Sequence, residues 1–170
     1  GTTFNLYSVS FTDSDNGTVV GGGGTIIRTI DGGINWTQQS SGTNRDLFGV
    51  SFRDLDNGIV VGYNGIILRT TNAGTNWTNQ PSVTTNSLYS ISTSNATYAT
   101  AVGWNGTIVH TTNNGISWIE QSSGTSHQLS DVSFANANNG MVAGWYGTIL
   151  KTTDGGNNWY GVNTTPPAVE

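Results

Sequence analysis

An eight-residue segment that recurs at a constant interval constrains the fold of this chain more than any other feature. Each of its four copies begins with a threonine and ends with a tryptophan, and these tryptophans follow one another at 41-residue steps: Trp36, Trp77, Trp118 and Trp159. Leucines and glycines outside the segment keep the same step: Leu6, Leu47, Leu88 and Leu129, and Gly21, Gly62, Gly103 and Gly144. A period of this length is typical of propellers and solenoids, in which each repeat is one supersecondary unit.

Each copy of the segment has the composition of a polar turn closed by an aromatic anchor. Its third residue is an Asp or Asn, whose side chain is expected to accept hydrogen bonds from backbone N–H groups two residues on. These residues are Asp31, Asn72, Asn113 and Asp154. A glycine two positions later is expected to adopt positive φ, which it does without a Cβ clash. The four tryptophans are then expected to return the chain to the core, so the segment has a structural role.

The spacing of these residue types resembles a known repeat. The pattern resembles the Asp-box, or BNR repeat, of sialidases, sortilin-like receptors and photosystem II assembly-factor propellers. In that repeat a Ser or Thr is followed two residues later by an Asp or Asn, then two residues later by a Gly, and three residues after that by a Trp. The run Gly147–Trp159 is most similar to the photosystem II assembly-factor type. The resemblance covers essentially the whole chain, and it implies a β-propeller.

The residues between the boxes predict four short strands per unit. In the first unit these are residues 6–11, 18–20, 25–29 and 35–39, with an Asn-Gly hairpin turn after the first strand. The third unit has Thr97-Tyr-Ala at this turn, so a turn of different shape is expected there. Four short antiparallel strands cannot bury both faces of their sheet, so neighbouring sheets must stack on them.

Radial stacking of these units gives an all-β fold, a β-propeller of four 41-residue, four-stranded antiparallel blades. The predicted blades are about residues 6–41, 47–82, 88–123 and 129–164, and residues 165–170 are a tail or linker. A parallel β-helix fits less well because its coils are shorter and its strands are not successive hairpins. Three closures remain open: a closed four-blade ring, half of a two-chain eight-blade ring, or part of a larger propeller. The Pro166-Pro167 pair favours the last of these, because it stops a strand ladder.

Composition excludes several classes of site. The net charge is −5, with 5 Lys and Arg residues against 10 Asp and Glu, so the chain lacks the basic footprint of a nucleic-acid-binding protein. It has no cysteine, hence no thiolate site. His110 and His127 have no ligand partners at metal-site spacing, and Asp13 and Asp54 are better interpreted as Asx-turn residues than as calcium ligands. No metal, cofactor or transmembrane segment is expected. The Asn/Thr/Gly bias with few lysines predicts an extracytoplasmic location: secreted, periplasmic or at the cell surface.

The resemblance to sialidases raises hydrolysis as a function. It implies three arginines that grip a carboxylate, a Tyr nucleophile supported by a Glu, and an Asp acid/base. This chain has only Glu120 and Glu170 as glutamates, and its other carboxylates lie mostly in predicted turns. A sialidase-like glycoside hydrolase is therefore the weakest alternative, and no catalytic residue is assigned.

Two sets of residues are candidates for binding. The first set is Arg28, Arg69, His110 and Lys151, which occupy the same position at the end of the third predicted strand. The resemblance to the photosystem II assembly factors implies a protein client held on an arginine-rich surface, and these positions are where such a surface would lie. The alternative is that each side chain reaches a turn carbonyl or an Asp of a neighbouring blade.

The second set consists of aromatic residues between the second and third predicted strands: Tyr63, Trp104, Trp145 and Tyr146. Hairpin alternation places these tips on the face opposite the boxes, together with the linkers that carry Arg45 and His127. Exposed Trp and Tyr anchor protein interfaces and stack on sugar rings. The alternative is that they cover the edge of the next blade.

These observations predict a non-catalytic propeller scaffold that binds a protein or glycan partner through one face. The alternative is a structural subunit of a secreted or cell-surface assembly, formed by self-association when the ends of the repeat array stack on another copy.

Overall fold

The computed structural model describes residues 2–162, which form four separate four-stranded sheets. Each sheet is a meander in which neighbouring strands are antiparallel and follow one another in sequence. The first two sheets comprise β1 (Leu6–Phe11), β2 (Gly17–Gly21), β3 (Ile26–Thr29), β4 (Thr37–Gln39), β5 (Leu47–Phe52), β6 (Gly58–Gly62), β7 (Ile67–Thr70) and β8 (Thr78–Asn79). The other two comprise β9 (Leu88–Thr93), β10 (Ala99–Gly103), β11 (Ile108–Thr111), β12 (Ile119–Gln121), β13 (Leu129–Phe134), β14 (Gly140–Gly144), β15 (Ile149–Thr152) and β16 (Tyr160–Gly161). The predicted all-β fold of four antiparallel blades is confirmed.

A three-residue 3₁₀ turn joins the second and third strands of every sheet. These turns are η1 (Gly22–Gly24), η2 (Tyr63–Gly65), η3 (Trp104–Gly106) and η4 (Trp145–Gly147). They are the tips of the blades, and the Asp-boxes lie at the opposite end of each sheet, after the third strand. Within residues 2–162 these turns are the helical segments, and none has the length or apolarity to cross a membrane.

The sheets fan out from their first strands. β1 packs beside β5, β5 beside β9, and β9 beside β13, whereas the fourth strands of the described residues have no comparable contacts with one another. This is the arrangement of propeller blades around an axis, with the first strands innermost.

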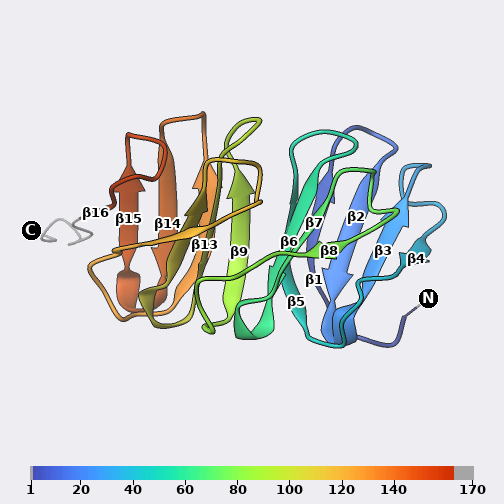
Figure 1. Cartoon of the computed structure of the whole chain (residues 1–170), viewed down its shortest axis with the longest axis horizontal. Helices are drawn as coiled ribbons and strands as arrows, with labels where there is room; N and C mark the ends of the chain where they lie inside the picture. The colour runs from blue at the N-terminus through green and yellow to red at the C-terminus, as the bar shows by residue number, and fades with distance from the viewer. Residues whose placement is uncertain (1, 163–170) are drawn as a thin grey trace, which may run out of the picture.

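The four blades form an open array. The first and last blades lie at opposite ends of the molecule, as do the two termini of the described chain (Figure 1). The packing that joins neighbouring first strands is not repeated between β13 and β1. The closed four-blade ring is therefore wrong for the described residues, whose first and last blades do not meet (Figure 1). The other two closures remain.

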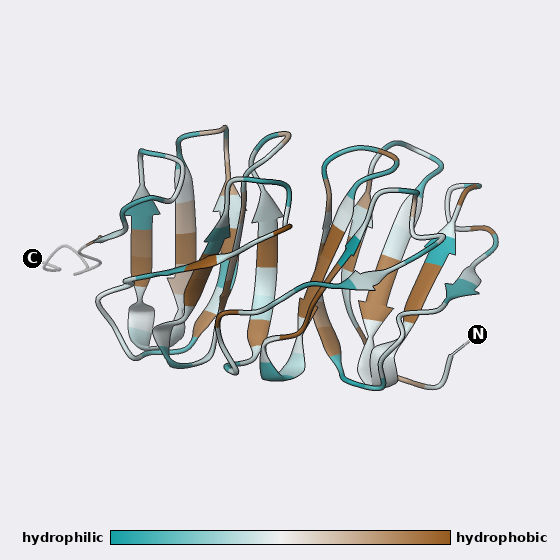
Figure 2. Ribbon diagram, viewed as in Figure 1, coloured by the Kyte–Doolittle hydropathy of each residue, from teal (hydrophilic) through white to brown (hydrophobic). Residues whose placement is uncertain are grey.

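The core lies between the blades rather than within them. Val20 and Ile26 of the first blade pack against Leu47, Val50 and Leu68 of the second, all of them buried. The same pairing of faces recurs at the next two junctions. Figure 2 shows hydrophobic bands along the strands, whereas the loops are mostly pale or hydrophilic. The second and third sheets thus each present one apolar face to the preceding blade and one to the next.

The box tryptophans also pack in the cores between blades, with one exception. Trp118 and Trp159 are 4% and 8% exposed, and Trp77 is partly buried, whereas Trp36 is 38% exposed. Each box tryptophan except Trp118 packs edge-on against the Phe that ends its own first strand. Trp77 and Trp159 also donate from Nε1 to a glutamine of the preceding blade. The prediction of four core anchors is therefore wrong for Trp36, which lies in the first of the described blades and does not pack against another of them.

The box turn differs in one detail from the expectation. Asp31 accepts from the backbone N–H of Asn35, four residues on rather than two, and from the Thr29 hydroxyl. Thr29 Oγ1 in turn accepts from the N–H groups of Asp31 and Gly33. The predicted positive φ is found at the box glycine of every blade: Gly33, Gly74, Gly115 and Gly156.

The hairpin turns between first and second strands are Asx turns, as expected for Asp13 and Asp54. Asp13 Oδ1 accepts from the N–H groups of Asp15 and Asn16, and Asp54 makes the same pair of bonds. In the third blade Asn95 takes the role of Asp13 and accepts from Thr97 and Tyr98. The prediction of a differently shaped turn there is wrong, because any Asp or Asn at this position supplies the same acceptor.

Candidate functional site

Each blade tip has two consecutive residues with positive φ, and the second of them is always a glycine, whereas the first varies from blade to blade. Gly23, Asn64, Asn105 and Tyr146 occupy the first position, with φ of 55° to 62°, in the left-handed region. Glycine and asparagine adopt it at little cost, whereas a bulky aromatic residue there is an outlier. Three backbone hydrogen bonds hold the η4 turn in place: Gly144 N–H to Thr148 O, Trp145 N–H to Gln128 O, and Thr148 N–H to Trp145 O. Tyr146 is consequently projected into solvent, 82% exposed.

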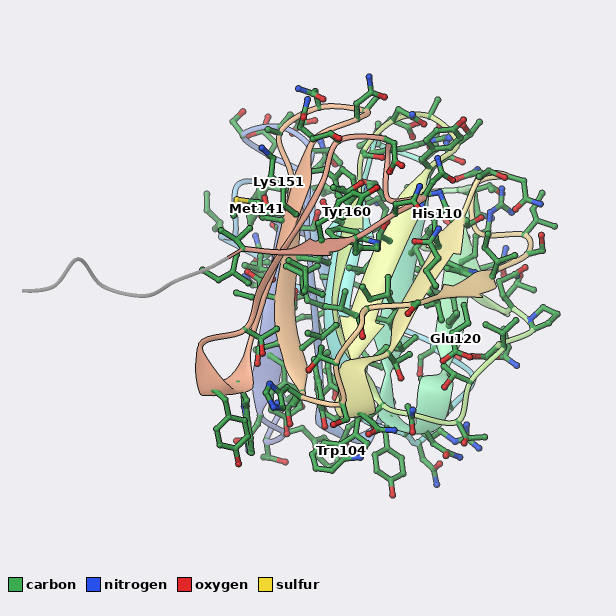
Figure 3. The ribbon with its side chains drawn as sticks, turned by 90° about the vertical axis from the view of Figure 1, so that its left-hand side faces the viewer. Trp104, His110, Glu120, Met141, Lys151 and Tyr160 are labelled. Atoms are coloured by element: carbon green, nitrogen blue, oxygen red, sulfur yellow. The ribbon has the colours of Figure 1, made fainter. Side chains whose placement is uncertain are left out.

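Tyr146 is part of the wall of a cavity of about 290 Å³ between the tips of the third and fourth blades. The lining residues are Trp104, Asn105, Ser126, His127, Gln128, Trp145 and Tyr146. Trp104 and Trp145, from η3 and η4, are about half exposed. Figure 3 shows Trp104 at the tip end of the blades, away from His110, Met141 and Lys151. We call this the tip cavity.

His127 is fixed within the tip cavity by its neighbours. Its Nδ1 lies 2.9 Å from Thr148 Oγ1, and its ring centroid lies 4.9 Å from that of Tyr146. The Tyr146 ring in turn meets Trp145 edge-on at 6.3 Å. The other side chains around the cavity are aromatic rings and uncharged polar groups. Such a surface can stack on flat or apolar groups and offers indole N–H, amide and hydroxyl partners for hydrogen bonds.

Three of the four predicted tip aromatics meet in this cavity: Trp104, Trp145 and Tyr146. Tyr63 stands on the same face, 57% exposed, but does not line it. Sequence reasoning assigned the linker with His127 to this face but did not include His127 or Gln128 in the site. The 41-residue period was the available signal, because it puts His127 in phase with Arg45 and Asn86, which also lie in linkers.

A row of aromatic residues on the first strands was also missed. Tyr7, Phe48 and Tyr89 are spaced at the repeat interval, and both successive pairs have ring centroids 5.5 Å apart. Burial raises the pKa of the Tyr89 hydroxyl. The row ends at the fourth blade, where Ser130 occupies the equivalent position.

The predicted basic set is divided among different environments. Arg28 donates to the Ala73 carbonyl and Arg69 to the Asn114 carbonyl, both in the box of the following blade and both at 2.6 Å. These contacts are the alternative stated for this set, a turn carbonyl of a neighbouring blade. Ligand binding by this set remains a prediction.

The other two members of the set differ from the arginines. His110 is 1% exposed, and its Nδ1 lies 3.0 Å from Thr100 Oγ1. Burial lowers the pKa of His110, although the charge of Asp154 partly offsets this effect. Lys151 is exposed on the outer face of the last blade (Figure 3).

The described residues do not gather the groups that a sialidase-like reaction needs. Arg28 and Arg69 lie at different blade junctions, and Arg53 pairs with Asp54 at 3.0 Å. Within residues 2–162, no cluster of three or more His, Asp or Glu side chains could hold a metal ion. Asp31 and Asp154 have lowered pKa values chiefly because Asn35 and Asn158 donate hydrogen bonds to them. These carboxylates are turn-stabilising groups.

Several solved structures share this fold. The structure described as YCF48 bound to D1 peptide is 20% identical to the chain, with a TM-score of 0.64 over 94% of this chain and 82% of that one. YCF48 from Cyanidioschyzon merolae is 24% identical, with a TM-score of 0.75 over 96% of this chain and 58% of that one. The GH74 enzyme of Niastella koreensis is 14% identical, with a TM-score of 0.73 over 92% of this chain and 30% of that one. At these identities the likeness is one of fold.

No curated protein matches the chain in sequence. The profile of the family described as Photosynthesis system II assembly factor YCF48, in contrast, matches residues 1–126 of the 170. The matched region includes the first three boxes and the three blades that carry them. The chain therefore belongs to the YCF48 family of photosynthesis system II assembly factors.

Proposed function

We propose that this protein is a non-catalytic scaffold that binds an extended segment of a partner protein in the tip cavity. The observation that carries the proposal is the convergence of two half-exposed indoles, an oriented imidazole and the strained Tyr146 around one cavity of about 290 Å³. Backbone strain in a bulky residue persists where the surroundings enforce it, and such residues cluster at binding sites.

The chemistry of the tip cavity suits a peptide. Trp and Tyr are the residue types that most often dominate binding energy at protein interfaces. They stand here on turns held by backbone hydrogen bonds, so little conformational entropy is lost on binding. A related YCF48 structure contains a D1 peptide, which supports a peptide as the ligand class. The Asn/Thr/Gly-rich, lysine-poor composition supports an extracytoplasmic location as part of the proposal.

A non-catalytic role is supported by the positions of Arg28, Arg69 and Arg53, which make separate contacts instead of converging on one site. A nucleophile, a base and a charge-stabilising group must converge on one point for hydrolysis. The likeness to GH74 enzymes concerns the fold, and unrelated functions share propeller folds.

The test is a titration of the chain with a D1 peptide, in which binding is measured by tryptophan fluorescence and by calorimetry. We expect saturable binding that Trp145→Ala weakens at least about tenfold, because truncation of a central aromatic anchor costs about 2 kcal/mol or more. Tyr63→Ala is the matched control, since Tyr63 is an exposed tip aromatic outside the cavity, and it should leave the affinity unchanged.

Two results would contradict the proposal: no binding of the peptide by the folded chain, or equal losses in the Trp145 and Tyr63 variants. A parallel titration with a soluble oligosaccharide separates the glycan alternative. Saturable, Trp145-dependent binding of the sugar with no response to the peptide would replace a protein partner by a glycan.

A further inference from the structure

Two of the three linkers between blades are tied to the next blade by a side-chain hydrogen bond. In the linker between the second and third blades, Asn86 Nδ2 donates to Thr107 Oγ1 at 2.8 Å. In the linker between the third and fourth blades, His127 Nδ1 lies 2.9 Å from Thr148 Oγ1. The two linker residues are 41 positions apart, and so are the two threonines, so this bond is a repeated feature of the junctions.

The first linker cannot form this bond. Arg45 occupies the position of the linker side chains, and Ile66 occupies that of the threonines. Ile66 has no hydrogen-bonding group in its side chain, and Arg45 is exposed. The described residues include one ion pair, between Arg53 and Asp54, so the Arg45 guanidinium has no carboxylate partner among them.

A cavity of about 400 Å³ lies between this linker and the outer strands of the second blade. Its lining includes Thr43 and Arg45 from the linker and Ile66, Leu68, Trp77 and Asn79 from the second blade. We call it the junction cavity. Trp77 is partly buried, whereas its equivalents Trp118 and Trp159 are fully buried. The cavity lies at an internal junction, between two blades that the structure describes.

The walls of the junction cavity are held by their neighbours. The Trp77 ring meets Phe52 edge-on at 5.9 Å, and its Nε1 lies 3.3 Å from Gln39 Oε1. On the linker side, Thr43 Oγ1 accepts from the backbone N–H of Arg45 at 3.1 Å. Since these groups are already fixed, little conformational entropy is lost when a ligand contacts them.

The charges around the first and second junctions are opposite in sign. The junction cavity has the Arg45 cation and the neutral amide of Asn79. At the second junction the equivalent positions hold the neutral Asn86 and the acidic Glu120. Because an unpaired guanidinium favours a carboxylate and an acidic side chain repels it, the first junction suits an anion and the second does not.

We propose that the junction cavity binds a small aromatic carboxylate. Arg45 donates two parallel hydrogen bonds to the carboxylate, which its planar guanidinium matches in shape. The aromatic ring contacts Ile66, Leu68 and Trp77, since ligand pockets combine apolar walls with a few polar groups that fix orientation. This cavity has no lining residue in common with the tip cavity, so the two sites are independent.

The experiment is a titration of the 170-residue chain with 2-naphthoate, followed by NMR of the tryptophan and arginine side-chain N–H signals. We expect saturable binding with a dissociation constant of about 1 mM or tighter, the affinity of an ordinary ligand of this size. 2-Naphthamide has the same ring without the charge and should bind at least about tenfold more weakly. Glucuronate has the charge on a polar ring and should also bind more weakly.

Variants assign the binding to Arg45. Arg45→Gln should weaken 2-naphthoate binding at least about tenfold, because a charged hydrogen-bond donor is lost. Arg53→Gln is the matched control, since Arg53 is paired with Asp54 outside the cavity, and it should leave the affinity unchanged. Trp145→Ala, in the tip cavity, should also leave it unchanged.

A double variant, Arg45→Asn with Ile66→Thr, copies the pair found at the second junction. It should form the missing bond, keep the near-ultraviolet circular dichroism spectrum of the wild type and lose 2-naphthoate binding. The proposal would be overturned by a wild-type chain that does not bind 2-naphthoate saturably, or by undiminished binding in Arg45→Gln. Equal affinity for 2-naphthamide, or tighter binding of glucuronate, would overturn it as well.

Discussion

Tyr146 is the residue at which local stability and binding are expected to conflict. The other blades have Gly23, Asn64 and Asn105 at the same left-handed position. We expect Tyr146→Asn to raise the free energy of unfolding by about 1 kcal/mol, since asparagine tolerates this conformation better. For a chain of this size the melting temperature should rise by about 2–4 °C. The same variant should weaken peptide binding, because it removes one wall of the tip cavity.

Calorimetric unfolding and peptide titration of the Tyr146 variant measure these two effects together. Asn105→Ala is the comparison, since it introduces strain at the equivalent tip and should lower stability. A Tyr146→Asn variant that is less stable than the wild type would contradict the assignment of strain to this residue.

The repeated glycine at the end of each second strand is explained by close approach of two backbones. A Cβ on Gly62 would clash with the carbonyl oxygen of Asp46, and the equivalent clash recurs at Gly21, Gly103 and Gly144. We expect Gly62→Ala to lower the free energy of unfolding by about 2 kcal/mol or more, because backbone atoms must move. Gly161→Ala, at a glycine with open space around it, should change stability little. Chemical denaturation of both variants measures the difference.

The burial of His110 is expected to make the stability of the protein depend on pH. Burial lowers its pKa from the ordinary value of 6.5, so below that value the unfolded chain takes up a proton more readily than the native protein. Stability should therefore be complete above about pH 6.5 and fall as the pH decreases toward the lowered pKa. Melting temperatures recorded between pH 7.5 and pH 5 would show this decrease.

The His110→Gln variant separates this effect from other titrations. It should lose most of the decrease in melting temperature between pH 7.5 and pH 5. Asp31 and Asp154 also have lowered pKa values, but their protonation reduces the free energy of unfolding only at pH values below about 4. An unchanged acid profile in the His110 variant would show that another group is responsible.

At the scale of single residues, the local backbone role of a residue could be predicted from the sequence more reliably than its hydrogen-bond partners. The sequence predicted the positive φ of the box glycines and the Asx role of Asp13, because both follow from local backbone chemistry. It could not decide where Arg28 and Arg69 point, since their partners lie 45 residues away in the next blade. Nor could it show that His110 is buried, because this depends on packing between blades.

At the scale of elements, the box is a turn organised by its threonine as much as by its acidic residue. Thr111 Oγ1 accepts from the N–H groups of Asn113 and Gly115 and donates to Asn113 Oδ1. Thr111 is 1% exposed, so water cannot replace these bonds. We expect Thr111→Val, which keeps the shape but removes the hydroxyl, to lower the free energy of unfolding by about 1–3 kcal/mol.

The adjacent Thr112 gives a matched control, since it is exposed and should tolerate the same substitution to valine within about 0.5 kcal/mol. Urea denaturation of the two variants provides the comparison. Equal effects would show that the hydroxyl does not organise the box.

Element order and strand type could be predicted from the sequence, because the period and the alternation of apolar residues are local signals. The boundaries could not be predicted as well: the fourth strand begins at Thr37, after the tryptophan, rather than at Asn35. The tip cavity was only partly predicted. Its aromatic walls lie in the tips, whereas His127 and Gln128 come from a linker whose position depends on the neighbouring blade.

At the scale of the whole molecule, the number of repeats did not determine closure. Whether the end blades meet depends on how neighbouring blades pack, through residues such as Val20, Val50 and Leu68 at the first junction, and this packing is not a local pattern. In the open array that results, Trp118 and Trp159 are buried in the cores between blades, whereas Trp36 of the first blade is exposed.

In the proposed function the partner binds at the end of the blades that carries the tips η1 to η4, rather than at the end that carries the Asp-boxes. Hydrogen–deuterium exchange of the intact chain with and without a D1 peptide tests it most directly, because it reports on every segment at once. We predict slower exchange in η3, η4 and residues 126–128, with no change in the Asp-boxes. Protection confined to the boxes, or no protection by a peptide that binds, would contradict the assignment of the tip cavity.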